Sequence, residues 1–154
     1  MRALTLIRPM SAAIVHGTKR VENRPKPLPK WMRDNRVLVA VHAGAGWDRD
    51  YELACERIDG PGFYGERFAD TGIVGAMILT GRAWVGRPED QYNAGPWYSG
   101  PHGYEIEWAA ALPEPIPCRG MLGFWTINDE KIERTICDLA LTHGKHDFCM
   151  EPSA

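Results

Sequence analysis

The stretch Arg36-Val37-Leu38-Val39-Ala40-Val41-His42 decides the fold of this sequence. It is rich in β-branched residues and lacks the polar alternation of a half-exposed strand, so it predicts a strand that is largely buried on both faces. Other segments predict further extended structure, at residues 4–7, 20–24, 73–85, 104–108 and 123–127. Residues 73–85 can hold one long strand or two strands broken at Thr80-Gly81. The sequence therefore predicts five or six short strands.

Three helices are expected beside these strands. Pro9 suits the first turn of a helix, and Gly17 suits the position just after its end. Residues 48–57 predict a second helix, with acidic residues in its first turn. A third is expected over residues 129–142, with Gly144 as its cap. Its inner stripe is formed by Ile132, Ile136, Leu139 and Ala140.

The connections complete the predicted fold class. Residues 60–72 and 86–103 predict long loops, and residues 113–117 predict a stiff proline-rich connection. Strands and helices do not alternate as βαβ units do. We therefore expect an α+β fold, a small β-barrel or curled sheet of five to six strands with flanking helices.

Length and composition favour one ordinary globular domain over residues 1–154. Apolar residues make up 44% and charged residues 25% of the 154, which argues against disorder. The longest apolar run, residues 73–79, is far shorter than the ~20 residues that cross a membrane, so no membrane partner is expected. Four cysteines are scattered without a pairing pattern, and no signal peptide is recognised, which predicts a cytoplasmic protein.

Charge is distributed unevenly along the chain. Residues 1–36 carry a local balance of +7, although the net charge of the whole chain is −2. Such asymmetry predicts a basic surface on a mildly acidic body, which is a possible footprint for phosphates. The alternative is a solvated face whose bases are paired with acids from elsewhere in the fold.

The segment Gly17-Thr-Lys19-Arg-Val-Glu22-Asn-Arg24 holds the first cluster that could carry chemistry. Strand alternation places Arg20, Glu22 and Arg24 on one face. Lys19 has the wrong parity for that face and would have to reach in from the turn after Gly17. A Glu between two Arg side chains can form an ion-pair cluster that leaves guanidinium donors free for a ligand. A purely structural salt-bridge network is the alternative.

Two further clusters contain aromatic residues. His42-Ala-Gly44-Ala-Gly46-Trp47 ends the clearest strand; its small residues permit close approach of a ligand, and Trp47 offers a stacking surface. A lone His at such a position is more often structural than catalytic. The segment around Trp97, Tyr98, His102 and Tyr104 either packs against the sheet or lines a pocket, where its rings would suit base stacking.

Neither a metal nor a cofactor is predicted. Cys137, His143, His146 and Cys149 are metal-ligand types, but their spacing matches no familiar zinc pattern. No serine lies in a G-x-S-x-G context, so a serine hydrolase has no support.

These motifs, taken in order, resemble an ASCH domain. The resemblance rests on the opening strand and helix, on Gly17-x-Lys19-x-x-Glu22-x-Arg24, and on the strand that ends in His42-Ala-Gly44. It continues through Ile73-Val-Gly75, the Trp97 to Tyr104 segment, and Leu112-Pro-x-Pro115-x-Pro-x-Arg-Gly120-x-Leu-Gly123-x-Trp125, and so covers residues 3–127. It implies a PUA-like barrel with a ligand cleft, RNA or nucleic-acid binding, and Lys19, Glu22 and Arg24 in that cleft.

One branch of ASCH-like proteins resembles amidohydrolases that deacylate acylated cytidine. That branch is thought to use a Lys, a nucleophilic Thr three residues later, and a distant Glu. Here Lys19 is present, but Glu22 stands where the Thr would be. A carboxylate cannot take over the same acyl transfer, since it would act as a general base on water or form a mixed anhydride.

Three functional hypotheses follow. The leading one is a module that binds RNA, single-stranded nucleic acid or a modified nucleotide in a basic, aromatic-lined cleft. Its expected ligand-binding residues are Lys19, Arg20, Glu22, Arg24, His42, Trp47, Trp97, Tyr98, His102 and Tyr104. The second is a small amidohydrolase of a modified nucleoside, with Lys19 and Glu22 as catalytic residues. The third is an adaptor that binds a protein partner, because interface cores also favour Trp, Tyr and Arg.

Overall fold

The computed structural model describes residues 1–150 and contains six strands, four α-helices and two short 3-10 helices. The strands are β1 (Arg2–Arg8), β2 (Val21–Arg24), β3 (Val37–Trp47), β4 (Gly72–Trp84), β5 (His102–Ile116) and β6 (Phe124–Thr126). The helices are α1 (Met10–Val15), α2 (Arg49–Asp59), α3 (Pro88–Asn93) and α4 (Glu130–Thr142), with η1 (Lys30–Met32) and η2 (Gly65–Ala69). The α+β class is thereby confirmed.

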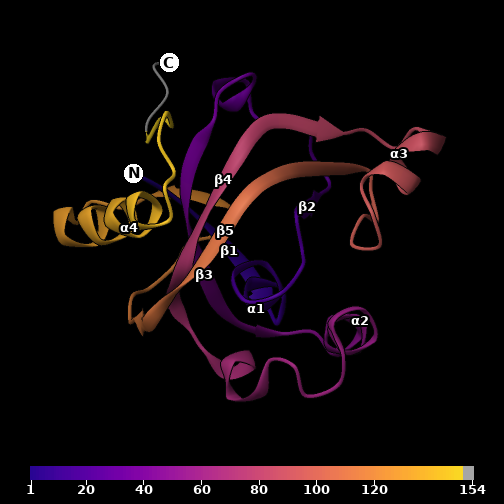
Figure 1. Ribbon diagram of the computed structural model, residues 1–154, viewed down its shortest axis with the longest axis horizontal. Helices are drawn as coiled ribbons and strands as arrows, with labels where there is room; N and C mark the ends of the chain where they lie inside the picture. Colours follow the sequence, from indigo (N-terminus) through magenta and orange to yellow (C-terminus); the bar gives the residue numbers. More distant parts are fainter. Residues whose placement is uncertain (151–154) are drawn as a thin grey trace.

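All six strands form one mixed sheet in the order β2-β5-β4-β3-β1-β6. β1 runs parallel to β3, while the other neighbouring pairs are antiparallel. Residues 37–43 of β3 are buried, as the β-branched run predicts. The long strands β4 and β5 arch over the molecule, and the sheet curves around α1 (Figure 1).

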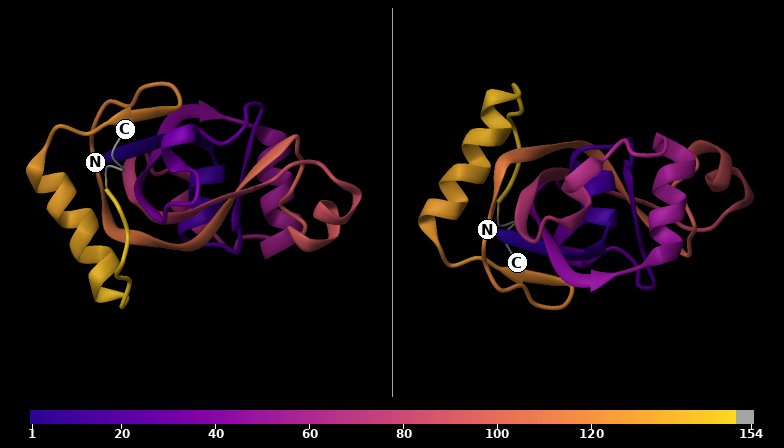
Figure 2. Two further views of the ribbon diagram at one scale, coloured as in Figure 1. Left: turned by 90° about the horizontal axis from the view of Figure 1, so that it is seen from above. Right: turned by 90° about the horizontal axis from the view of Figure 1, so that it is seen from below.

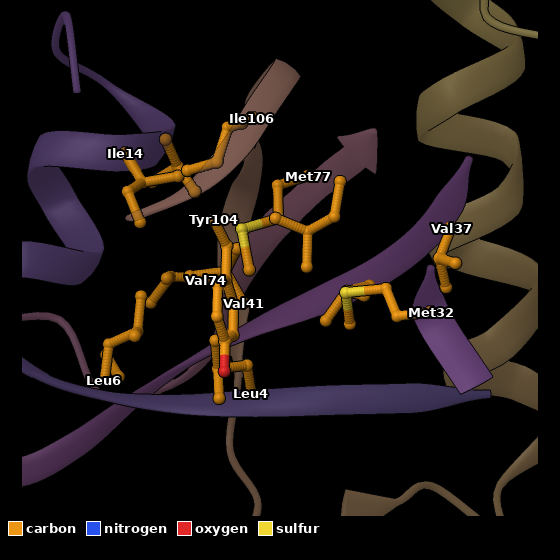
Figure 3. Close-up of a cluster of buried hydrophobic side chains, with 14 of the residues drawn as sticks. Leu4, Leu6, Ile14, Met32, Val37, Val41, Val74, Met77, Tyr104 and Ile106 are labelled. Carbon is orange, nitrogen blue, oxygen red and sulfur yellow. The ribbon is translucent and has the colours of Figure 1, made fainter. Parts of the chain in front are cut away.

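The two faces of the curved sheet carry separate hydrophobic clusters. Inside the curve, Leu4, Val41 and Met77 pack with Ile14 of α1 (Figure 3). On the other face, Leu38 and Ile78 share a cluster with Ile136 of α4. Helix α4 therefore lies against the outside of the sheet, at the opposite end of the molecule from α3 (Figure 2). The predicted helix over residues 129–142 is confirmed, with Asp129 as its N-cap.

The sheet is curled but not closed within residues 1–150. Its edge strands are β2 and β6, and no backbone ladder joins them. They nevertheless approach each other, because a Cβ atom placed on Gly123, next to β6, would lie 3.6 Å from Nη2 of Arg24 in β2.

Of the two alternatives for residues 73–85, the single strand is confirmed: residues 72–84 form one strand, and the chain passes through Gly81 at positive φ with only a shift in register. Two other sequence-based expectations were wrong. β5 continues through the expected connection at residues 113–117, because register irregularities near Ile116 accommodate the prolines. Helix α3 lies within the expected loop 86–103, where the Asp90 carboxylate accepts hydrogen bonds from the backbone amides of Val85 and Arg87.

No helix in the described chain is long and apolar enough to cross a membrane. Cys55, Cys118, Cys137 and Cys149 are all free thiols, as their spacing suggests.

Candidate nucleotide-binding cleft

The centre of the candidate site is a chain of charges on the Lys19 to Arg24 segment. The Lys19 ammonium donates to the carbonyl of Val21 and to Oε2 of Glu22, the latter at 3.1 Å. The other carboxylate oxygen of Glu22 lies 3.5 Å from Nη1 of Arg24. Lys19 is only 2% exposed and Glu22 5%, so both charges lie away from bulk water. A buried ion pair of this kind must be held in good geometry to be tolerated.

A hydrogen-bonded network fixes the turn that delivers Lys19. The Thr18 hydroxyl and the Tyr64 hydroxyl both donate to the carboxylate of Asp59 in α2. The indole N–H of Trp97 donates to Thr18 Oγ1 at 3.0 Å. Burial, followed by the hydrogen bond to Asp59, raises the pKa of Tyr64, so its hydroxyl remains a donor. A side chain on Gly17 would collide with Tyr64 and Asp59, which explains the glycine at this turn.

Lys19, Glu22 and Arg24 open into a small cavity of about 150 Å³. Its remaining walls are formed by Leu6, Ile7, Met10, Asn23, Tyr51 and Ser99. Tyr51 and Ile7 are about 40% exposed and form its rim. A volume of 150 Å³ holds roughly five water molecules. The cavity thus combines charged groups at its base with an apolar and aromatic rim.

A second hollow of about 690 Å³ adjoins the cavity, since both are lined by Leu6 and Ile7. His42 lies at its base and is 4% exposed. Its Nε2 is 3.2 Å from the carbonyl of Cys118, and its Nδ1 is 3.2 Å from Oγ1 of Thr5. A carbonyl only accepts, so neutral His42 carries its proton on Nε2 and accepts from Thr5 at Nδ1. Because both nitrogens have partners, His42 anchors the 117–122 segment in a structural role.

The basic side chains of residues 1–36 are largely unpaired with acids. Arg36 pairs with the distant Glu107, while Lys19 and Arg24 pair with Glu22. The other six form no ion pair in the described chain, and they are Arg2, Arg8, Arg20, Lys26, Lys30 and Arg33. The sequence-based alternative of a face neutralised by distant acids therefore holds for Arg36 alone.

Arg20 does not join the charge cluster, contrary to the expectation from strand alternation. β2 begins at Val21, and the Arg20 guanidinium instead donates to the carbonyls of Ile14, Gly17 and Lys19. The Glu22 carboxylate lies between Lys19 and Arg24 rather than between two arginines. Lys19 reaches in from the turn, as its parity required.

The predicted aromatic residues are dispersed. Trp97 and Tyr98 are buried in a core cluster with Val21 and Tyr64, so they cannot present a stacking face. Trp47 contacts Phe68 edge-on and hydrogen-bonds to Glu52, outside the cavity lining. His102 pairs with Arg24 across the β2–β5 ladder but does not line the cavity. Tyr104 is buried below the loop that follows β2.

Sequence reasoning missed Tyr51 and Ser99, which line the same cavity as Lys19. Tyr51 lies in the first turn of α2. Ser99 follows Trp97 and Tyr98 in the loop before β5, where its backbone amide donates to Oδ1 of Asn23. Neither belongs to a motif; only the packing of α2 and this loop beside β2 brings them to Lys19. None of the predicted aromatic residues lines this cavity, and the ring that does, Tyr51, was not predicted.

The described residues contain no group of three or more His, Cys, Asp or Glu side chains suited to a metal ion. Comparison of the sequence with models of protein families and with curated proteins finds no match.

Proposed function

We propose that this protein binds RNA, single-stranded nucleic acid or a modified nucleotide, with one base in the Lys19–Glu22–Arg24 cavity. The proposal includes an ASCH-type, PUA-like barrel as the fold, in which the gap between β2 and β6 is the open side. The observation that carries it is a buried charge cluster at the base of a small cavity, beside unpaired cations. Most described bases of the N-terminal third have no carboxylate partner. Among them, Lys26, Lys30 and Arg33 are exposed and make at most one long hydrogen bond, so they are available to phosphates.

The groups in the cavity suit the edge of a base. Glu22 supplies acceptor oxygens and Arg24 supplies planar guanidinium donors, which is the chemistry that reads exposed hydrogen-bonding edges. Tyr51 at the rim is exposed enough to stack on a ring. Asn23 is already committed, since its amide donates to the carbonyl of Trp97 and its oxygen accepts from Ser99. Glu22, Arg24 and Tyr51 are therefore the proposed contacts.

A second candidate is an amidohydrolase of a modified nucleoside, favoured by one observation. Ser99 lines the same cavity as Lys19 and Glu22, so a hydroxyl is present although position 22 lacks one. In that reaction the Ser99 hydroxyl would attack the acyl carbonyl and pass its proton to a neighbouring base, and the C–N bond would break as that proton is given to the leaving amine. Water would then hydrolyse the acyl-serine and release the carboxylic acid. The Lys19 amine is less suited to be that base, because it already donates to Val21 and Glu22. We therefore rank binding above catalysis.

The experiment is incubation of the protein with a mixture of normal and modified nucleosides and nucleotides, including acylated cytidine. Mass spectrometry follows which species are retained and which are converted. Retention without conversion, lost in Arg24→Ala, supports the binding function. A product that disappears in Ser99→Ala and Lys19→Met establishes the hydrolase instead. If neither retention nor conversion occurs, and single-stranded oligonucleotides are not bound either, the proposed function is wrong.

A further inference from the structure

A basic groove lies in the gap between β2 and β6, the two edge strands of the sheet. Its volume is about 900 Å³, and it runs from Arg24 in β2 to Phe124 in β6. The proline-rich loop 25–30 forms one wall, and Leu122 and Gly123 form the other. Among the residues that the structure describes, the groove is lined by no acidic residue and by four cationic ones, Arg24, Lys26, Lys30 and Arg33.

The loop that carries these cations is held rigidly. The Tyr104 hydroxyl shares its one proton between the carbonyls of Lys26 and Pro27, at O···O distances of 3.0 and 3.1 Å. Leu28 and Met32 are buried in the inner core and anchor the loop on either side of Lys30. Pro25, Pro27 and Pro29 restrict the backbone between these anchors. A ligand would therefore meet cations whose backbone positions are already fixed, which lowers the entropy lost on binding.

The charges on the loop are free to bind a ligand. Lys26, Lys30 and Arg33 are exposed, and none of them forms an ion pair in the described chain. Arg33 makes one long hydrogen bond, 3.4 Å from its Nε to the carbonyl of Leu28. Unpaired cations around an acid-free groove favour a polyanion over a neutral or cationic occupant.

The groove is continuous with the proposed base cavity. Arg24 lines both, so a ligand in the cavity lies one side chain away from the groove. We propose that the groove holds the phosphates and flanking bases of a single strand whose central base occupies the cavity. This inference rests on the proposed function and narrows its ligand to a polynucleotide strand, of which a free nucleoside fills the cavity alone.

The apolar parts of the groove fit bases better than they fit a carboxylate-rich peptide. Prolines and Leu122 present flat apolar surface next to the cations, and Leu122 is 99% exposed. Phe124 lies deeper, against Trp31 and Tyr104. A strand supplies both a phosphate every few ångströms and bases that cover apolar surface. An acidic peptide supplies the charge without the flat rings.

The test compares two probes on matched variants. The probes are a mixture of nucleosides, which carry no phosphate, and a fluorescent, mixed-sequence single-stranded RNA of about ten nucleotides, within the ~4–16 that one small domain covers. The groove variant is Lys26→Ala/Lys30→Ala/Arg33→Ala. The control, Arg57→Ala/Lys131→Ala/Arg134→Ala, removes the same charge from exposed positions of α2 and α4 that line neither the cavity nor the groove.

We expect the groove variant to lose roughly tenfold or more in RNA affinity at low salt, with nucleoside binding unchanged because a nucleoside carries no phosphate for the groove cations. The slope of log affinity against log salt concentration should become less steep by about 2. Each phosphate contact to a single strand contributes ~0.7 to its magnitude, and the variant removes three cations. The control variant should match the wild type for both probes. If the groove variant binds RNA as tightly as the wild type, this inference is wrong and the proposed function stands. The same holds if poly-glutamate competes for the wild-type protein as well as unlabelled RNA does. If the wild-type protein binds neither of the two probes, the proposed function and this inference are both wrong.

Discussion

Gly120 lies directly against the imidazole ring of His42, at the point where the 117–122 segment crosses β3. A Cβ atom at position 120 would overlap the ring atoms Cε1, Nδ1 and Nε2. His42 is held in place by Thr5 and by the carbonyl of Cys118, so it cannot swing away freely. Gly120 and His42 both line the hollow of about 690 Å³, and their close packing there requires a residue without a side chain at position 120.

Substitution Gly120→Ala should lower the free energy of unfolding by about 1–3 kcal/mol, because overpacking a fixed ring forces neighbours to shift. Urea denaturation measures this. His42→Ala alone should also destabilise, since the Thr5 hydroxyl loses the acceptor for its proton and the Cys118 carbonyl loses its donor. In the double variant the steric part of the Gly120→Ala cost should disappear. Additive costs would show that the two residues do not press on each other.

Glu22→Gln should destabilise the fold strongly. It leaves the buried Lys19 ammonium without its carboxylate, and breaking a buried pair from one side costs ~3–5 kcal/mol. Lys19→Met/Glu22→Gln should regain much of that loss, because no buried charge remains uncompensated. Both variants should fail to bind nucleotide. A single variant as stable as the wild type would show that water reaches Lys19.

Tyr51 and Trp97 should respond oppositely to substitution by Ala. Tyr51 is 42% exposed at the cavity rim, so its loss should reduce nucleotide affinity by about 1–3 kcal/mol and barely change stability. Trp97 is 8% exposed within a core cluster, so its loss should cost ~3–5 kcal/mol of stability. Binding titrations and denaturation, run on the same samples, separate the two effects. Unchanged affinity in Tyr51→Ala would remove Tyr51 from the site.

The Arg36–Glu107 pair should make stability depend on acid. The hydrogen bond from Arg36 holds the pKa of Glu107 below its ordinary value near 4.5. The folded state therefore binds this proton more weakly than the unfolded state does. The stabilisation is fully present above pH ~4.5 and is lost as the pH falls toward the folded-state pKa. Thermal melting between pH 3 and 6, the range around ordinary carboxyl pKa values, should show a smaller acid-induced loss in Glu107→Gln than in the wild type.

The four thiols should differ in reactivity. Burial, and then the charge of Asp59, raises the pKa of Cys55 to about 12, whereas Cys149 is exposed. Since the thiolate is the nucleophile, a thiol reagent at mildly alkaline pH should label Cys149 first and Cys55 only on unfolding. Peptide mass spectrometry identifies the order. Early labelling of Cys55 would contradict the packing of α2 against the Lys19 turn.

Local patterns in the sequence predict the charge cluster better than they predict its surroundings. Alternation correctly places Glu22 and Arg24 on one face, and the parity of Lys19 correctly requires it to reach in from the turn. Alternation fails for Arg20, because the strand begins one residue later and the carbonyls at the end of α1 capture its guanidinium. A strand boundary one residue away is enough to remove a side chain from the site.

The aromatic residues show where sequence reasoning ends. Trp97 and Tyr98 form a motif that is easy to see, yet their burial depends on contacts with Val21 and Tyr64 from distant parts of the chain. Tyr51 belongs to no motif and reaches the cavity only through the position of α2. The same holds for the groove, whose walls at residues 25–30 and 122–124 meet only because the sheet curls. Such placements are set by tertiary packing.

The gap between β2 and β6 also makes the molecule mechanically uneven. Strands joined by a backbone ladder keep a spacing near 4.8 Å, and that spacing changes only when hydrogen bonds break. β2 and β6 face each other instead across prolines, aliphatic chains and the ring of Phe124. Apolar contacts of this kind are non-directional and can slide. The width of the groove can therefore change while every backbone ladder stays intact, because the 25–30 loop, fixed to Tyr104 of β5, can shift as one unit against Leu122 and Phe124.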